Sequence, residues 1–358
     1  MSQVLEKIRS MGSRVFSREA ALPFPDTLNI ESSYACNLKC VMCPRHFEGV
    51  PQGMFTLDLF EKHLQPYVGK FKYVHLTGWG EPLMNKDLPE IIRRCRAAGV
   101  WTCFTSNGLL LRPPLDRKIL ETNLELISVS CDADNAQTYE YVRGKGTFDV
   151  LVERLTAFNK LRREMGAQTT MQWSFVQLRQ NFEQLPGAIR LAAKAGFDVF
   201  VAKHIETVIN RVELGDAMWN TGMAPDMTPE LVARHDEVLE EAREVARETG
   251  VNLTIHPRKM SHQGMCIVKP VTNLFVDYEG RVSSCCYLNK NDVRPYNLPG
   301  EKSVDDQGLY GDLRLGNLMT FLESEKFRQF QRDWRDGAVP EACRGCLQVN
   351  RINSTSTD

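Results

Sequence analysis

The chain has 358 residues, which is enough to bury one large α/β core or two smaller cores. Its 44 Lys and Arg residues balance 45 Asp and Glu residues, so the formal charge of -1 predicts no overall attraction to nucleic acid or to an anionic membrane surface. The N-terminal extension, 1–26, carries charges every few positions and no long apolar run, which predicts a cytoplasmic protein without signal peptide or membrane anchor.

From residue 27 onward, short β-rich runs alternate with amphipathic runs. The alternation predicts strands at 27–33, 72–78, 100–108, 124–132, 169–178 and 197–204. Between them it predicts helices at 57–68, 88–99, 114–123, 148–166 and 182–196. Strands that alternate with helices form parallel sheets covered on both faces. The fold class predicted is therefore α/β, a partial (β/α)6 parallel barrel that falls short of the eight units of a closed barrel.

The second half of the chain changes character twice. Residues 206–228 have no clear period and are predicted to form a lid or insertion, before a helix at 229–250 and a strand at 251–257. We therefore expect the barrel to occupy 27–258. Residues 259–350 are expected to form a small C-terminal domain with a β-hairpin at 271–287 and a helix near 320–335, followed by a polar tail at 351–358. This domain has few apolar periodic segments, so a metal site is expected to stabilise it.

Three cysteines follow the first predicted strand directly: Cys36, Cys40 and Cys43, spaced C-x3-C-x2-C. A loop after a strand lies at the carboxyl edge of a parallel sheet, where α/β folds carry their sites. Three close thiolates can hold three corners of an iron–sulfur cube. The alternative is a zinc site that takes a fourth ligand from elsewhere, for example His46.

This arrangement resembles the radical S-adenosylmethionine (SAM) enzymes, which carry C-x3-C-x2-C in the first strand-to-helix loop of a partial barrel. The resemblance implies a [4Fe-4S] cluster whose fourth iron is chelated by the amino and carboxylate groups of SAM. It also implies reductive cleavage of SAM to a 5′-deoxyadenosyl radical, which abstracts a hydrogen atom. An electron donor such as flavodoxin or ferredoxin is the partner implied.

Further segments at successive strand ends resemble the SAM-binding segments of this family. "GWGEP" after the second strand is similar to the segment that binds the SAM ammonium, and "YVRGKGTFD" is similar to one in which an arginine meets the SAM carboxylate. The family commonly has an aromatic residue before the third cysteine, where this chain has a methionine whose backbone can still contact adenine. The SAM-binding residues implied are Met42, Gly78, Gly80, Glu81, Ser106, Asn107, Ser130, Asp132 and Arg143.

A second set of cysteines, Cys266, Cys285, Cys343 and Cys346, lies in the C-terminal region. It resembles the auxiliary-cluster domains of the SPASM/twitch type, which implies a second [4Fe-4S] cluster with four protein thiolates. Zinc held by the same four thiolates is the alternative. Cys286 is then left over. If it lies on a strand, its side chain points away from that of Cys285, and it is either a small buried residue or a hydrogen-atom donor to a substrate radical.

The leading interpretation is an enzyme that abstracts hydrogen from a small polar metabolite, of sugar or aminocyclitol type, and so dehydrogenates or epimerises it. Dehydrogenation needs a base, for which His204 and Glu206 at the end of the sixth predicted strand are the candidates. A second hypothesis is modification of a ribosomal peptide or protein by oxidation, epimerisation or crosslinking. A third is a non-catalytic iron–sulfur redox sensor.

Overall fold

The computed structural model describes residues 22–43, 45, 52–144, 147–204, 228–256, 266, 268–289 and 308–343. Across them, none of the helices combines the length and the apolar character that crossing a bilayer requires.

The strands of the described residues form one ten-stranded sheet, in the order β10-β9-β8-β1-β2-β3-β4-β5-β6-β7. Neighbouring strands from β8 to β7 are parallel, whereas β9 pairs antiparallel with β8 and with β10. The strands are β1 (Thr27–Ile30), β2 (Tyr73–His75), β3 (Trp101–Ser106), β4 (Leu126–Ser130), β5 (Thr170–Gln177), β6 (Val199–His204), β7 (Asn252–Ile255), β8 (Asn273–Val276), β9 (Arg281–Ser283) and β10 (Leu309–Asp312). The predicted parallel partial barrel is confirmed.

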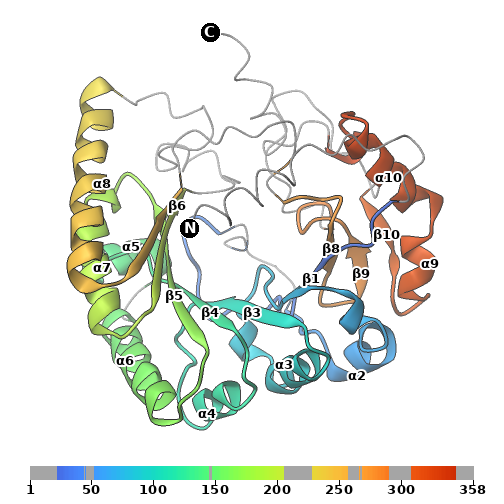
Figure 1. The fold of residues 1–358 in the computed structure, drawn as a ribbon, viewed down its shortest axis with the longest axis horizontal. Coiled ribbons are helices and arrows are strands. Elements are labelled where there is room, and N and C mark those ends of the chain that lie inside the picture. The colour runs from blue at the N-terminus through green and yellow to red at the C-terminus, as the bar shows by residue number, and fades with distance from the viewer. Residues whose placement is uncertain are drawn as a thin grey trace, which may run out of the picture.

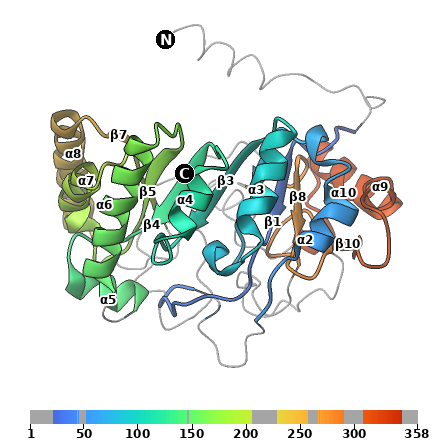
Figure 2. The same cartoon turned by 90° about the horizontal axis from the view of Figure 1, so that it is seen from below.

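The sheet curves into an open arc, and the helices lie on its outer, convex side (Figure 1). Figure 2 shows the same helices side by side along the outside of the strands. They are α2 (Leu57–Leu59), α3 (Leu88–Ala97), α4 (Leu115–Leu120), α5 (Ala136–Arg143), α6 (Phe148–Glu164), α7 (Leu185–Lys194), α8 (Pro229–Thr249), α9 (Leu318–Leu322) and α10 (Glu325–Arg335). We call the inner, concave side of the arc the lumen.

Local chemistry sets the ends of the long helices. In α8 the side chain of Thr228 accepts a hydrogen bond from the Leu231 amide, and Pro229 occupies the first helical position, where its missing N–H costs nothing. The helix ends at Gly250, whose φ of 74° is accessible to glycine without steric penalty. α8 therefore has a defined length and packs against α7.

Side chains alternate between the two faces along the central strands. Trp173, Phe175 and Phe200 are fully buried and contact one another on one face, toward the helices that contact β6. Because successive strand residues point to opposite faces, the residues between them face the lumen. The strands thus present an apolar layer to the helices, and a second set of side chains to the lumen.

Three features differ from the expectation. The helix expected at 57–68 is interrupted, with α2 continuing into a π-helical turn at Phe60–Leu64 and a separate 3-10 turn at Val68–Lys70. The C-terminal hairpin, β8 and β9, is confirmed, but β8 pairs with β1 and so continues the barrel sheet. Strand β10 lies between the hairpin expected at 271–287 and the helix expected near 320–335, where no strand was predicted. The tail at 351–358 and nearly all of the expected lid lie outside the described residues, and the domain boundaries stay predictions.

Candidate active site

The three-cysteine loop leaves the carboxyl end of β1, as expected. Cys40 is buried, while Cys36 and Cys43 are half-buried. Burial raises the pKa of Cys43 to about 11, although hydrogen bonding from the Arg45 amide opposes this, and the neighbouring Cys40 and Cys36 raise it further. The three thiols are therefore close enough to influence one another's charge.

Among the described residues, no group of three His, Cys, Asp or Glu side chains converges on a point that could hold a single metal ion. A [4Fe-4S] cube takes one thiolate at each iron corner, so its ligands need not converge in that way. His46, the ligand considered for a zinc site, lies outside the described residues. Three thiols in one loop are a donor set that suits an iron–sulfur cluster.

The GWGEP segment after β2 lies directly against the cysteine loop. The amide of Gly80 donates to the Ser33 carbonyl at 3.1 Å, and the amide of Glu81 donates to the Ala35 carbonyl at 2.7 Å. A Cβ on Gly80 would stand 2.4 Å from both of those carbonyl oxygens, so only glycine allows this approach. A Cβ on Gly78 would stand 2.1 Å from the side chain of Glu31. The structure thus brings the two predicted segments together.

Glu81 is almost fully buried and its carboxylate is held by three donors. The Ser106 hydroxyl donates to Oε1 at 2.7 Å, the Leu83 amide donates to Oε1 at 3.0 Å, and the Asn107 amide donates to Oε2 at 2.7 Å. Burial raises the pKa of Glu81, and these hydrogen bonds oppose the shift. The expected partner of the SAM ammonium is therefore also the residue that joins the ends of β2 and β3.

Two of the remaining expected residues lie at the cysteine loop, since Asn107 contacts it and Met42 belongs to it. The Asn107 side chain donates to Asn37 Oδ1 at 2.8 Å, which ties the end of β3 to the loop. Met42 packs against Val142 and Leu178. Ser130 ends β4 and is half-buried on the lumen side of the sheet. Their roles toward SAM stay predictions.

Asp132 and Arg143, both among the expected SAM-binding residues, contact each other, and their roles toward SAM stay predictions. The Arg143 guanidinium donates to Asp132 Oδ2 through Nε at 2.6 Å and through its NH2 group at 2.5 Å. Its third nitrogen lies 3.8 Å from Cys40 Sγ. Burial raises the pKa of Cys40, and the positive charge of Arg143 opposes this rise.

The second group of cysteines gathers in the C-terminal region. Cys266, Cys285 and Cys343 are all buried, whereas Cys346 lies outside the described residues. Burial raises the pKa of Tyr310 well above its usual value, and the thiols of Cys343 and Cys285 raise it further. Tyr310 is therefore close to both thiols. Cys95 and Cys131, by contrast, belong to the hydrophobic core.

Cys285 and Cys286 do not point in opposite directions as a strand would require. Strand β9 ends at Ser283, so the two cysteines lie in the turn that follows. The Cys286 thiol forms a hydrogen bond with Cys285, and this contact together with burial raises the pKa of Cys285. The expectation from strand alternation was wrong here because the chain leaves the strand before the pair. The amide of Tyr287 also donates to Cys285 Sγ at 3.4 Å.

The GWGEP segment of the barrel contacts the C-terminal region. The rings of Trp79 and Tyr287 lie 5.3 Å apart, edge to face. Glu31 Oε1 accepts from the Trp79 amide at 3.1 Å, and Oε2 accepts from the Tyr278 amide at 3.4 Å. The expected SAM-binding segment is therefore packed against the region that holds Cys285.

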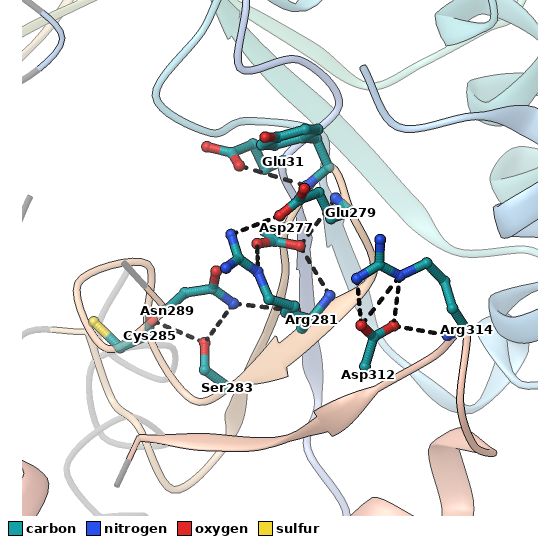
Figure 3. Close-up of polar contacts among 10 residues, drawn as sticks. Glu31, Asp277, Glu279, Arg281, Ser283, Cys285, Asn289, Asp312 and Arg314 are labelled. Carbon is teal, nitrogen blue, oxygen red and sulfur yellow. Dashed lines mark hydrogen bonds and ion pairs between the residues drawn. The ribbon is translucent and has the colours of Figure 1, made fainter. Parts of the chain in front are cut away.

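Figure 3 shows how the hairpin that contacts Glu31 is stabilised. Arg281 Nε donates to Asp277 Oδ2 at 2.7 Å. At the other end of the hairpin, Asn289 Nδ2 donates to Ser283 Oγ at 3.4 Å, and that hydroxyl donates to the Cys285 carbonyl at 2.9 Å. Polar contacts thus extend from the hairpin turn to the Cys285 backbone.

His204 lies on the helix side of the sheet. It lies two and four residues after Ala202 and Phe200 in β6, so its side chain is on the same face of the sheet as theirs. Its ring centroid is 6.5 Å from that of His235 in α8. His204 Nε2 is 3.1 Å from the His256 carbonyl. The expectation that His204 enters the pocket is not met, because the two-residue period of the strand points it at α8. Glu206 lies outside the described residues.

Lys203 is the residue that the sequence reasoning missed. Its two neighbours, Ala202 and His204, face the helices, so the half-buried Lys203 points to the opposite face, which is the lumen. It pairs in register with Val176 of β5. The sequence carries one signal for this orientation. Lys203 is three residues after the large apolar Phe200 in the same strand, so the two side chains point to opposite faces of the sheet. The sequence favours His204 over Lys203 as a base, because the ordinary pKa of histidine lies near neutral pH.

Comparisons with known proteins identify two domains. The family model described as Radical SAM superfamily matches residues 30–171, and the model described as Iron-sulfur cluster-binding domain (SPASM) matches residues 266–347. The second match spans all four cysteines of the C-terminal set, of which the structure describes Cys266, Cys285 and Cys343.

Two curated relatives and one solved structure illustrate the likeness. The chain is 24% identical over 328 residues to a tungsten-containing aldehyde ferredoxin oxidoreductase cofactor-modifying protein of Pyrococcus furiosus, covering 89% of this chain and 86% of that protein. It is 32% identical over 186 residues to mycofactocin maturase MftC of Mycolicibacterium smegmatis, covering 50% of this chain and only 44% of MftC. The structure of Streptococcus suis SuiB bound to S-adenosylmethionine has a TM-score of 0.61 at 13% identity, covering 92% of this chain and 77% of SuiB.

The two domain matches determine the cofactors, which are SAM and two [4Fe-4S] clusters. The SuiB structure shares the fold, and it was solved with S-adenosylmethionine bound. The chain belongs to the radical SAM superfamily of enzymes, in the group whose members carry a C-terminal SPASM domain.

Proposed function

We propose that this enzyme removes a hydrogen atom from a hydroxyl-bearing carbon of a small polar metabolite, of sugar or aminocyclitol type, held in the lumen. The observation that carries the proposal is the polar character of the lumen side of the central strands. The lumen-facing residues of these strands include Thr105, Ser128, Ser130, Gln172, Ser174 and Lys203, with Val176 and Val201 among the apolar members.

These side chains form neighbouring rows across the sheet. Thr105 pairs in register with Ser128, and Ser128 pairs with Gln172. The Gln172 amide donates to Ser128 Oγ at 2.9 Å. Hydroxyl and amide groups in such rows both donate and accept hydrogen bonds, as a ligand rich in hydroxyl groups requires.

The cofactors would be held at the carboxyl edge of the same sheet. We assign Cys36, Cys40 and Cys43 to the SAM-binding cluster, and Cys266, Cys285, Cys343 and Cys346 to the auxiliary cluster. With SAM and the clusters bound, the site supplies one electron for the cleavage of SAM and a radical that removes a hydrogen atom from the substrate. The chain itself orients the substrate and excludes water. We expect Lys203, which lies on the lumen face of β6, to contact a substrate hydroxyl.

The substrate class is tested by release of 5′-deoxyadenosine. Reduced, reconstituted enzyme is incubated with SAM and a panel of sugars, aminocyclitols and unrelated apolar alcohols, and nucleoside release is measured for each. The proposal expects stimulation by one or more of the polyols and by none of the apolar alcohols. Stimulation by the apolar set alone would contradict it.

The fate of the substrate radical is tested with the same reaction in D2O. Deuterium gained without a change in oxidation level indicates epimerisation, whereas a product lighter by a pair of hydrogen atoms indicates dehydrogenation. The half-buried Cys286 is the candidate hydrogen donor for the first outcome. A Cys286→Ala variant that still incorporates deuterium at the wild-type rate would remove Cys286 from that role.

Peptide modification is the second candidate, and the fold itself favours it. SuiB has also been solved with its precursor peptide SuiA bound, at a TM-score of 0.59 to this chain, so a protein of this fold binds a peptide. The test is whether a peptide encoded near the enzyme is captured by the full chain and changes mass on turnover. A mass change in the peptide, with no polyol stimulating nucleoside release, would favour this candidate over the first.

Flavodoxin or ferredoxin is the electron donor that we propose. Either protein can be tested by replacing the chemical reductant in the nucleoside-release assay. Release with one of them and its reductase, but not with the reductase alone, is the expected result.

A further inference from the structure

We propose that Arg143 is a positioning residue for the SAM-binding cluster: anchored by Asp132, its guanidinium supports the Cys40 thiolate and raises the reduction potential of that cluster. The inference rests on the proposed assignment of Cys40 as a cluster ligand. It differs from the expectation that Arg143 binds the SAM carboxylate, because the role proposed here is exerted on the protein before SAM arrives.

The geometry assigns all three nitrogens of the guanidinium. Nε and Nη2 both donate to Asp132 Oδ2, at 2.6 and 2.5 Å, and Nη1 lies 3.8 Å from Cys40 Sγ. A backbone hydrogen bond joins the same two segments, because the Val41 amide donates to the Val142 carbonyl at 3.1 Å. The end of α5 and the cysteine loop are therefore held together by both side-chain and main-chain bonds.

Asp132 is itself rigidly held. Its side chain is fully buried, and Oδ1 accepts from the Val176 amide at 2.8 Å. The side chain of Asn181 donates to the Asp132 carbonyl at 2.8 Å. Both carboxylate oxygens of Asp132 therefore accept hydrogen bonds, Oδ1 from the Val176 amide and Oδ2 from Arg143. A carboxylate held in this way can orient Arg143, as hydrogen-bonded carboxylates orient the ligands of metal sites.

A positively charged N–H group near a ligand sulfur stabilises the reduced cluster more than the oxidised one, because reduction adds negative charge. Hydrogen bonds to cluster sulfurs raise reduction potentials for the same reason. Lysine at position 143 keeps the positive charge for Asp132 but has a single donor group in place of the fork. It cannot contact Asp132 with two nitrogens and Cys40 with a third.

The test is the midpoint potential of the SAM-binding cluster in the full chain without SAM, followed by electron paramagnetic resonance. The signal of this cluster is identified as the one lost in the Cys36/Cys40/Cys43→Ala variant. In Arg143→Lys we expect the equilibrium constant for one-electron reduction to fall about tenfold, which is about 59 mV toward more negative potential. The iron content should be that of the wild type.

Arg162→Lys is the matched control. Arg162 is also largely buried and also pairs with an aspartate, Asp198, but the pair lies at the amino edge of the sheet, before β6. We expect its midpoint potential to equal that of the wild type. A wild-type potential in Arg143→Lys, with SAM affinity lowered, would overturn the inference in favour of the carboxylate-binding role.

A second measurement does not depend on folding of the Arg143 variant. Protein labelled with 15N in its arginine guanidinium groups is reduced, and 15N coupling to the cluster is sought by pulsed electron paramagnetic resonance. Arg45 is the other arginine that influences these cysteines, so the coupling must persist in Arg45→Lys. Absence of coupling in that variant would overturn the inference. Survival of the cluster signal in the triple cysteine variant would instead contradict the proposed ligand set.

Discussion

Glu81 accepts a hydrogen bond from the Asn107 amide at 2.7 Å, so one buried carboxylate connects the loops after β2 and β3. Both loops contact the cysteine loop, through the Ala35 carbonyl and through Asn37. The three segments that resemble SAM-binding motifs therefore form one hydrogen-bonded unit. Disturbing any of its buried contacts should affect SAM binding as well as stability.

Replacing Glu81 with glutamine should weaken this unit. The glutamine NH2 group cannot accept from the Asn107 amide, and leaving a buried donor without an acceptor costs about 1–3 kcal/mol. We expect the free energy of unfolding to fall by that amount, and the affinity for SAM, measured by anaerobic equilibrium dialysis, to fall with it. Glu90→Gln is the control, because Glu90 pairs with Arg93 near the surface of α3 and such pairs contribute about 0–1 kcal/mol. Equal losses in both variants would contradict the account.

Gly80→Ala should displace the cysteine loop. The new Cβ would meet the Ser33 and Ala35 carbonyl oxygens at 2.4 Å, and these backbone atoms cannot move away as a flexible side chain would. We expect a loss of about 1–3 kcal/mol in stability and less iron retained after reconstitution. In Gly69→Ala the nearest atom would be 3.8 Å away, so its stability and iron content should match the wild type. Wild-type iron content in Gly80→Ala would show that the close approach is not needed.

Glu31→Ala should loosen the contact between the barrel and the C-terminal region. The amides of Trp79 and Tyr278 both donate to its carboxylate, so we expect hydrogen exchange at these two amides to become about tenfold faster or more, given about 1–3 kcal/mol for each lost acceptor. Glu61→Ala, which removes a partly exposed partner of Arg94, should leave both amides unchanged. Unchanged protection at Trp79 and Tyr278 in Glu31→Ala would contradict this role.

The strands and helices of the barrel could be predicted because local hydrophobic periodicity specifies them. The continuation of the sheet through β8 could not, because β8 pairs with β1, a strand far away in the sequence. The interruption at Phe60–Leu64 was not predicted either, since its composition is that of an ordinary helix.

Within the site, residue types and spacing predicted which segments meet, but not how the side chains point. In β6 both faces are largely apolar, so the pattern alone does not tell which face is the lumen, and His204 was expected on the wrong side. For Cys285 and Cys286 the outcome differs because β9 ends at Ser283, two residues before the pair. Arg143 and Asp132 were both expected at the site, but their mutual ion pair depends on the three-dimensional arrangement of β4 and α5.

The most direct test of the central claim is the iron and acid-labile sulfide content of anaerobically reconstituted protein, compared between the wild type and the Cys36/Cys40/Cys43→Ala variant. Two cysteine-held [4Fe-4S] clusters predict about eight irons per chain in the wild type and about four in the variant. Equal iron content in the two proteins, or zinc in place of iron in the wild type, would contradict the account.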